Sequence, residues 1–65
     1  MRIIVNGEHK EVAAQTLEAL LAECGYHSSK IATALNSTFI HRHLRTETTL
    51  SENDRVEVVS PIEGG

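Results

Sequence analysis

The pattern of apolar and polar residues predicts a strand near each end of the chain. In a strand, successive side chains point to opposite faces of the sheet. If residues 1–6 (MRIIVN) and 55–59 (RVEVV) are strands, each has apolar side chains at every second position, on one face. We expect these strands to lie side by side at the centre of one sheet. Their inner face would carry Ile3, Val5, Val56 and Val58, and the outer face would carry Ile4 and Val59.

A hairpin is predicted directly after the first strand. Asn6-Gly7 is a strong signal for a tight turn, because both residue types tolerate positive φ angles. The returning strand should run from about Glu8 to Ala14, with Val12 and Ala14 on the inner face. Its apolar signal is thin, so we expect this strand at an edge of the sheet.

One amphipathic helix should follow the hairpin. Thr16 is a suitable N-cap, because its hydroxyl can accept a hydrogen bond from a free amide of the first turn. Glu18 suits the positive end of the helix dipole, and Gly25 supplies the left-handed residue that often closes a helix. The apolar stripe recurs at i, i+3, i+4 and i+7 and consists of Leu17, Leu20, Leu21 and Cys24.

The second half of the chain predicts further strands. Residues 31–35 alternate well enough for a strand, and Asn36-Ser37 can turn the chain into Phe39 and Ile40. Another turn signal, SEND, stands immediately before RVEVV. The order is hairpin, helix and two or more strands, with one helix stripe to bury against one sheet face. This order predicts an α+β fold.

Composition limits the classes of function. A chain of 65 residues forms one domain at most, and a single cysteine excludes an internal disulfide. The chain shows no signal-peptide pattern and no apolar run of membrane-spanning length, so we expect a soluble cytoplasmic protein without a membrane partner. The net charge is -3, and Tyr26 and Phe39 are the only aromatic residues, which argues against a nucleic-acid partner. Five of the nine acidic residues lie in residues 47–65, and they suit a partner with a basic surface or are simply solvated.

The side chains form no complete catalytic or metal-binding set. Cys24 lies on the apolar stripe, where a free cysteine behaves as a small apolar residue. His41-x-His43 would place two imidazoles on one side of a strand, and Cys24 with His27 has a loose metal-ligand spacing. Neither pair supplies the four ligands of a structural zinc site. We therefore interpret these histidines as exposed residues and expect no metal.

The carboxyl terminus, SPIEGG, is the strongest candidate for chemistry. A free α-carboxylate is ionised at neutral pH and is a poor acyl donor until it is activated, for example by transfer to ATP as an acyl-adenylate. Gly64 and Gly65 suit such a reaction, because without Cβ atoms they can enter a narrow channel and leave the carbonyl unshielded. Residues 60–65 could extend roughly 20 Å from the last strand into an active site of a partner.

The whole chain resembles the sulfur carrier proteins of thiamine biosynthesis, which are small β-grasp domains of the ubiquitin-like superfamily. The resemblance is carried by IIVNGE, TLEALL, ATALNSTFIHR and the closing LSENDRVEVVSPIEGG. It implies a single β-grasp domain over residues 1–65, with a mixed sheet of four to five strands packed on one main α-helix and a flexible tail at residues 60–65. It also matches Asp54 to the acidic turn position that precedes the last strand in the family.

The resemblance implies a reaction cycle run by partner enzymes. An adenylyltransferase of the ubiquitin-activating type would use ATP to adenylate the Gly65 carboxylate, and a sulfur donor, either a desulfurase or a relay protein, would convert it to a thiocarboxylate. Thiazole synthase would then take the sulfur. The chain would be a carrier and co-substrate rather than an enzyme, with no bound cofactor, and Gly64 would give access to the reacting group.

Docking of these partners is expected on the outer face of the sheet. Ile4, Val59 and Ile62 are apolar residues on or near that face, and contiguous exposed apolar surface often marks an interface. The alternative is that these residues are scattered on the surface without consequence.

Three positions depart from the pattern of the family. Asn53 stands where glycine is common, although asparagine tolerates left-handed angles. His41 stands where proline is frequent before the arginine matched by Arg42, and Glu63 is more polar than the usual residue before Gly-Gly. Other functions therefore stay open: a carrier like the molybdopterin synthase small subunit, a ubiquitin-like protein modifier, or an interaction module with an inert tail.

Overall fold

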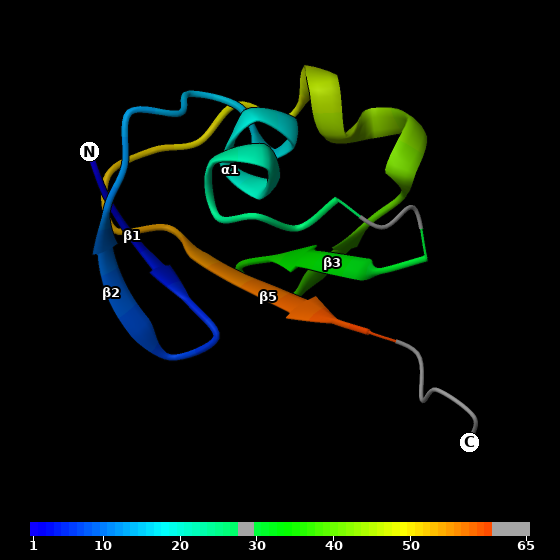
Figure 1. Cartoon of the computed structure of the whole chain (residues 1–65), viewed down its shortest axis with the longest axis horizontal. Coiled ribbons are helices and arrows are strands. Elements are labelled where there is room, and N and C mark those ends of the chain that lie inside the picture. The colour runs from blue at the N-terminus through cyan, green and yellow to red at the C-terminus, as the bar shows by residue number, and fades with distance from the viewer. Residues whose placement is uncertain (28–29, 61–65) are drawn as a thin grey trace.

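The computed structural model describes residues 1–27 and 30–60, and the elements in this part of the chain form one sheet with two helical segments on one side (Figure 1). Two hairpins and a last strand build the sheet. Its strands are β1 (Arg2–Val5), β2 (Glu8–Glu11), β3 (Ala32–Leu35), β4 (Thr38–Ile40) and β5 (Arg55–Val59). The helical segments are the α-helix α1 (Leu17–Glu23) and the 3-10 helix η1 (Arg42–Glu47).

The sheet has the strand order β2-β1-β5-β3-β4, with β5 in the middle. β5 runs parallel to β1 and antiparallel to β3, so the sheet is mixed. Residues Val5 and Val56 are paired across β1 and β5, and Ala32 is paired with Val59 across β3 and β5. The predicted pairing of the first and last strands and the predicted α+β arrangement are confirmed.

Both hairpin turns use positive φ angles, as their sequences predict. Asn6 and Gly7 have φ values of 50° and 83°, and Asn36 and Ser37 have values of 50° and 73°. Positive φ at both central residues is the signature of the two-residue turn that matches the twist of the flanking strands. Gly25 after α1 has φ of 87°, which confirms the predicted left-handed end of the helix.

The returning strand of the first hairpin is shorter than predicted. β2 is an edge strand, as expected, but it ends at Glu11, and all four of its residues are exposed. Val12 and Ala14 are buried in the core although they lie after the end of the strand. The carboxylate of Glu23 explains this, because it accepts hydrogen bonds from the backbone amides of Ala13 and Ala14 at 3.0–3.2 Å and so takes the place of a strand partner.

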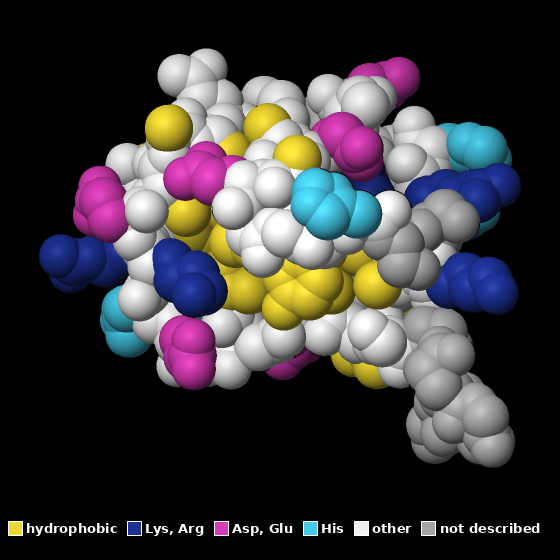
Figure 2. All heavy atoms as spheres, viewed as in Figure 1, with side chains coloured by type: hydrophobic (Ala, Val, Ile, Leu, Met, Phe, Trp, Pro, Cys, Tyr) yellow, Lys and Arg dark blue, Asp and Glu magenta, His cyan; other side chains and the backbone are white. Residues whose placement is uncertain are grey.

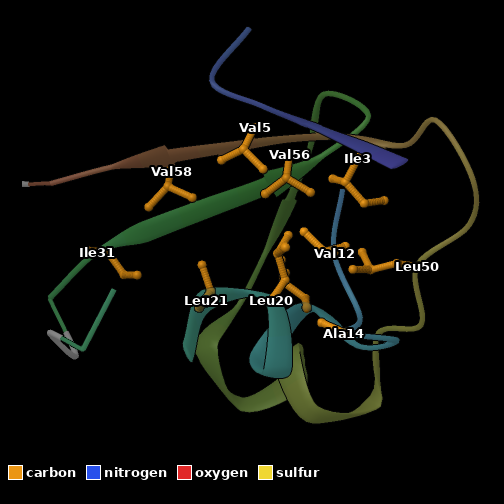
Figure 3. Packing of buried hydrophobic residues seen from close by; sticks show 11 residues of the cluster. Ile3, Val5, Val12, Ala14, Leu20, Leu21, Ile31, Leu50, Val56 and Val58 are labelled. Atoms are coloured by element: carbon orange, nitrogen blue, oxygen red, sulfur yellow. The ribbon is translucent and has the colours of Figure 1, made fainter. Parts of the chain in front are cut away.

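The core lies between the sheet and α1 (Figure 3). Thr16 caps the helix as predicted, with its Oγ1 accepting from the Ala19 amide at 3.2 Å. The leucines of the helix stripe are buried, while Cys24 at the helix end is only half-buried. In Figure 3 the sheet residues point toward Leu20 and Leu21, and the core is formed by Ile3, Val5, Val12, Ala14, Leu17, Leu20, Leu21, Ile31, Leu50, Val56 and Val58.

The segment η1 is not predicted by the sequence pattern. It packs beside α1 and lies on the same side of the sheet (Figure 1). Its Arg45 is buried, and the side chain donates from Nε to Thr33 Oγ1 at 3.1 Å and from Nη2 to the Ile31 carbonyl at 2.7 Å.

No helix in the described ranges has the length and apolar character needed to cross a membrane.

Candidate functional site

The candidate reactive residues follow the central strand. β5 ends at Val59 and Ser60 is exposed, whereas Ile62, Gly64 and Gly65 lie outside the described residues, as do residues 61–65 of the segment 60–65 that is predicted to be flexible. What the structure gives is therefore the base from which this segment leaves. β5 is the central strand and is paired with β1 on one side and β3 on the other, so this base is held along both of its edges.

Asn6 fixes the end of β5 that leads to the tail. The regular pairing of β1 with β5 stops at Val5 and Val56. Beyond it, the side-chain amide of Asn6 accepts from the Val58 N–H at 2.8 Å and donates to the Val58 carbonyl at 3.2 Å. Asn6 thus satisfies both backbone groups of a residue that stands two positions before Ser60, as a strand partner would.

Asn36 fixes the beginning of the same strand. Its Oδ1 accepts from the Arg55 N–H at 3.0 Å, and its backbone N–H donates to the Arg55 carbonyl at 2.7 Å. Its Nδ2 also donates to Asp54 Oδ1 at 3.1 Å, while Asp54 Oδ2 accepts from the Ser51 amide at 2.7 Å. The turn before β5 contains Asn53 with φ of 70°, so the left-handed angle expected at this position is present.

The outer face of the sheet carries exposed apolar side chains. Val59 is 61% exposed and Phe39 is 63% exposed, and the strand register links them through Ala32 and Ala34 of β3. We call Ala32, Ala34, Phe39 and Val59 the outer patch. Ile4 lies on the same face but is half-buried rather than exposed. It is paired with Arg55, which is at the opposite end of β5 from Val59.

The other candidate side chains do not come together as a catalytic or metal site. His41 and His43 lie at the start of η1 rather than on a strand as expected, with their rings stacked at a centroid distance of 4.7 Å. The His43 amide donates to His41 Nδ1 at 3.2 Å, which occupies one ring nitrogen. Cys24 is a free thiol. In residues 1–27 and 30–60, no group of three or more potential metal-ligating side chains is found.

The sequence does not predict that Phe39 is exposed. It also does not predict that the side chains of Asn6 and Asn36 bond to β5. The turn signals locate both asparagines, but the use of their side chains depends on which strand passes beside each turn. Phe39 gave no signal of its own, because an aromatic residue in a short strand is more often buried than exposed.

Comparisons with known proteins agree on one family. The family model of the ThiS family matches residues 3–65. Two curated relatives named thiazole synthase, from Paramagnetospirillum magneticum and Magnetococcus marinus, are 33% and 39% identical over 66 residues. These matches cover the whole of this chain, which spans about a fifth of the length of each relative, 20% in both cases.

Solved structures show the same fold over the whole chain. The crystal structure of a thiamine biosynthesis protein (ThiS) from Geobacter metallireducens has a TM-score of 0.82 and 26% identity, and all of both chains is covered. A solution structure of a thiamine biosynthesis protein from the same organism has a TM-score of 0.81 and 25% identity, covering 100% of this chain and 88% of that one. With a mixed five-stranded sheet, one main helix and a family match that includes Gly64-Gly65, the chain belongs to the ThiS family of sulfur carriers, which have the ubiquitin-like β-grasp fold.

Proposed function

We propose that this chain carries sulfur as a thiocarboxylate on Gly65 and donates it for thiazole formation in thiamine biosynthesis. The observation that carries this proposal is the family match, which extends through the Gly64-Gly65 pair. The hydrogen bonds from Asn6 and Asn36 to β5 also support this proposal. Because β5 is fixed to the rest of the fold, a partner that binds the folded domain can receive the residues after β5 in its active site.

The first step is activation of an unreactive group. An oxygen of the Gly65 carboxylate attacks the α-phosphorus of ATP, pyrophosphate leaves, and the acyl-adenylate forms. The adenylyltransferase partner supplies the catalytic groups, so this chain acts as co-substrate. Its own contribution is two residues without Cβ atoms, which leave the reacting carbonyl accessible.

The second step replaces the adenylate by sulfur. A sulfur nucleophile from the donor attacks the acyl carbon, and AMP leaves with the bonding electrons. If the donor is a persulfide, a thiol reductant must then cleave the sulfur–sulfur bond to free the thiocarboxylate. A thiocarboxylate sulfur is a nucleophile, so it can be transferred to an electrophilic carbon of a thiazole precursor on the synthase.

Thiazole synthase is the proposed acceptor of the sulfur. Two relatives that carry this name contain a segment similar to the whole of this chain within a longer protein. If a carrier domain and a synthase domain that act on the same sulfur are linked in one chain, the linkage raises the effective concentration of the carrier at the synthase. We propose that the partner enzymes dock on the outer face of the sheet, over the outer patch, with Ile4 at its border; the expected contribution of Ile62 remains a prediction from the sequence.

The first step is tested by ATP–pyrophosphate exchange with the cognate activating enzyme. Addition of this protein should start the exchange, and deletion of Gly65 should abolish it. Gly64→Val should lower kcat/KM by about tenfold or more, because a branched side chain next to the reacting residue misplaces it, whereas Gly64→Ala should have a smaller effect. Exchange that proceeds equally well without Gly65 would contradict the proposal.

A further inference from the structure

A polar cleft of about 420 Å³ lies between the end of α1 and η1. His27 lines it from the segment after α1, and Arg42, His43 and Arg45 line it from η1. Glu18 is the single carboxylate in this lining. The protein as a whole has a net charge of -3, so a cleft with this balance of side chains stands out from the rest of the surface.

Arg45 is the unusual member of this set. It is only 6% exposed, and arginine is almost never buried to this degree unless it is paired. Its two hydrogen bonds go to neutral oxygens, those of Thr33 and Ile31, and neither ion pair in the described part of the chain includes Arg45. The guanidinium charge is therefore held in place without a negative partner, which is costly inside a protein.

The remaining nitrogen of this guanidinium, Nη1, reaches the protein surface. Nη1 has no protein acceptor, yet no buried side-chain nitrogen in residues 1–27 and 30–60 is left without a partner, so Nη1 must reach the surface. Arg45 contributes to the surface of this cleft. Because Nε and Nη2 are tied to the sheet, Nη1 has a fixed direction, as a site for an oxyanion requires.

The neighbouring groups add donors from two segments. An arginine has N–H donors only, and an imidazole can donate to an oxyanion. Arg42 and His43 come from η1, and His27 comes from the segment that follows α1. A tetrahedral ion presents oxygens in several directions and can accept from both segments, whereas a planar carboxylate presents two oxygens on one side.

We propose that this cleft binds a phosphate group, either as inorganic phosphate or as the phosphate of a small monoester. Ile31 also lines the cleft, and the next residue, Ala32, is paired with Val59 at the end of β5. In Figure 2, basic and histidine side chains lie at the end of the molecule where β5 finishes, and others lie at the opposite end. The site therefore lies at the end of the sheet from which the tail departs, and it is separate from the carboxylate chemistry of Gly65.

The test is a titration of the isotope-labelled full chain with inorganic phosphate, followed by amide chemical shifts at constant ionic strength. We expect saturable shifts confined to residues around the cleft, at about millimolar phosphate, as for a small ligand held by a few charge-assisted hydrogen bonds. Acetate at the same ionic strength should give no saturable shifts there. AMP separates the two sources, because binding of AMP with similar affinity shows that a monoester is accepted and its failure restricts the site to the free ion.

Variants link binding to the named side chains. Arg42→Gln should weaken phosphate binding about three- to fivefold, and Glu18→Gln should strengthen it by a similar factor, because each alters one charge of the lining. Arg45→Gln should weaken it about tenfold or more, and the two exposed variants carry the test if this one fails to fold. Arg55→Gln removes a charge outside the cleft and should change nothing. Shifts that are scattered over the surface, equal with acetate, or unaltered by Arg42→Gln and Glu18→Gln would overturn the proposal.

Discussion

Asn6 and Asn36 have the same φ angle, and the side-chain amides of both bond to β5. Both have φ of 50° at the first position of a hairpin turn. Asn6 bonds to Val58 near the end of β5, and Asn36 bonds to Arg55 at its beginning. At both turns, the asparagine that adopts the positive φ angle therefore also forms hydrogen bonds to β5, the strand that precedes the tail.

Asn6→Gly tests this role, because it keeps the turn and removes the bonds to Val58. Loss of two partly buried hydrogen bonds should lower the free energy of unfolding by about 1–2 kcal/mol. This corresponds to a fall in Tm of roughly 4–8 °C per kcal/mol for a domain of this size. Asn6→Asp is the matched control: it retains the acceptor for the Val58 N–H but sets an oxygen against the Val58 carbonyl, so it should also destabilise. A glycine variant as stable as the wild type, with an equally protected Val58 amide in hydrogen exchange, would contradict the role.

Ser37 offers a gain in stability at the second hairpin. Its φ of 73° is in the left-handed region, where a residue with a Cβ atom is strained. Ser37→Gly should raise the free energy of unfolding by about 0.5–1 kcal/mol, since relief of strain exceeds the added freedom of the unfolded chain. Ser37→Ala keeps the Cβ atom and should bring no gain. Urea unfolding measures both, and an equal effect of alanine and glycine would rule out backbone strain as the cause.

At the scale of elements, the strands and α1 follow closely from the sequence, and the exceptions have physical reasons. The inner faces of β1 and β5 were readable because they alternate, and Thr16 and Gly25 mark the ends of the helix region. β2 ends earlier than predicted, because Ala13 and Ala14 bond to the Glu23 carboxylate instead of to a neighbouring strand while Val12 and Ala14 stay buried. Such a contact between distant residues leaves no periodic signal.

The segment η1 could not be predicted for a related reason. Its sequence, RHLRTE, has no apolar stripe, and a buried arginine contradicts the usual placement of charge at the surface. Only the fold brings Thr33 and the Ile31 carbonyl to Arg45. The candidate site divides in the same way: the glycine pair is visible in the sequence, whereas the outer patch and the bracing of β5 depend on strand register.

Glu23 connects the end of α1 to the segment after β2, and this contact can be tested by substitution. Glu23→Ala removes its hydrogen bonds to Ala13 and Ala14 and should lower the free energy of unfolding by about 1–3 kcal/mol. Glu23→Gln keeps one side-chain acceptor and should recover part of this loss. Exposed Glu18 on the same helix makes no such contact, so Glu18→Ala is the control in thermal unfolding. Equal effects of Glu23→Ala and Glu18→Ala would show that the bonds to Ala13 and Ala14 contribute nothing.

In the whole protein, α1 and η1 cover one face of the sheet, and no helix in the described part of the chain lies on the opposite face (Figure 1). The outer patch lies on this opposite face and includes Val59, the last residue of β5. A partner that docks here, as we propose, would contact the fold beside the last residue of β5, from which the proposed reactive segment continues.

Substitutions on the outer face test the docking proposal. Val59→Asp and Phe39→Asp should each weaken binding of the activating enzyme by about tenfold or more, because a charge is placed in an apolar contact. Ile4→Asp should have a smaller effect, since Ile4 lies farther from the end of β5. Thr46→Asp on η1 adds the same charge to the covered side and should leave the affinity unchanged. Affinities that do not respond to Val59→Asp and Ile4→Asp would refute docking on this face.

Intact mass spectrometry shows whether Gly65 receives sulfur, as we propose. The protein is incubated with its activating enzyme, ATP and a sulfur donor, and fragment spectra then locate any change of mass. We predict a gain equal to the exchange of one oxygen for one sulfur, confined to the Gly65 carboxylate and absent when ATP is omitted. A terminus that keeps its original mass while the activating enzyme is demonstrably active, or a change located elsewhere in the chain, would contradict the account.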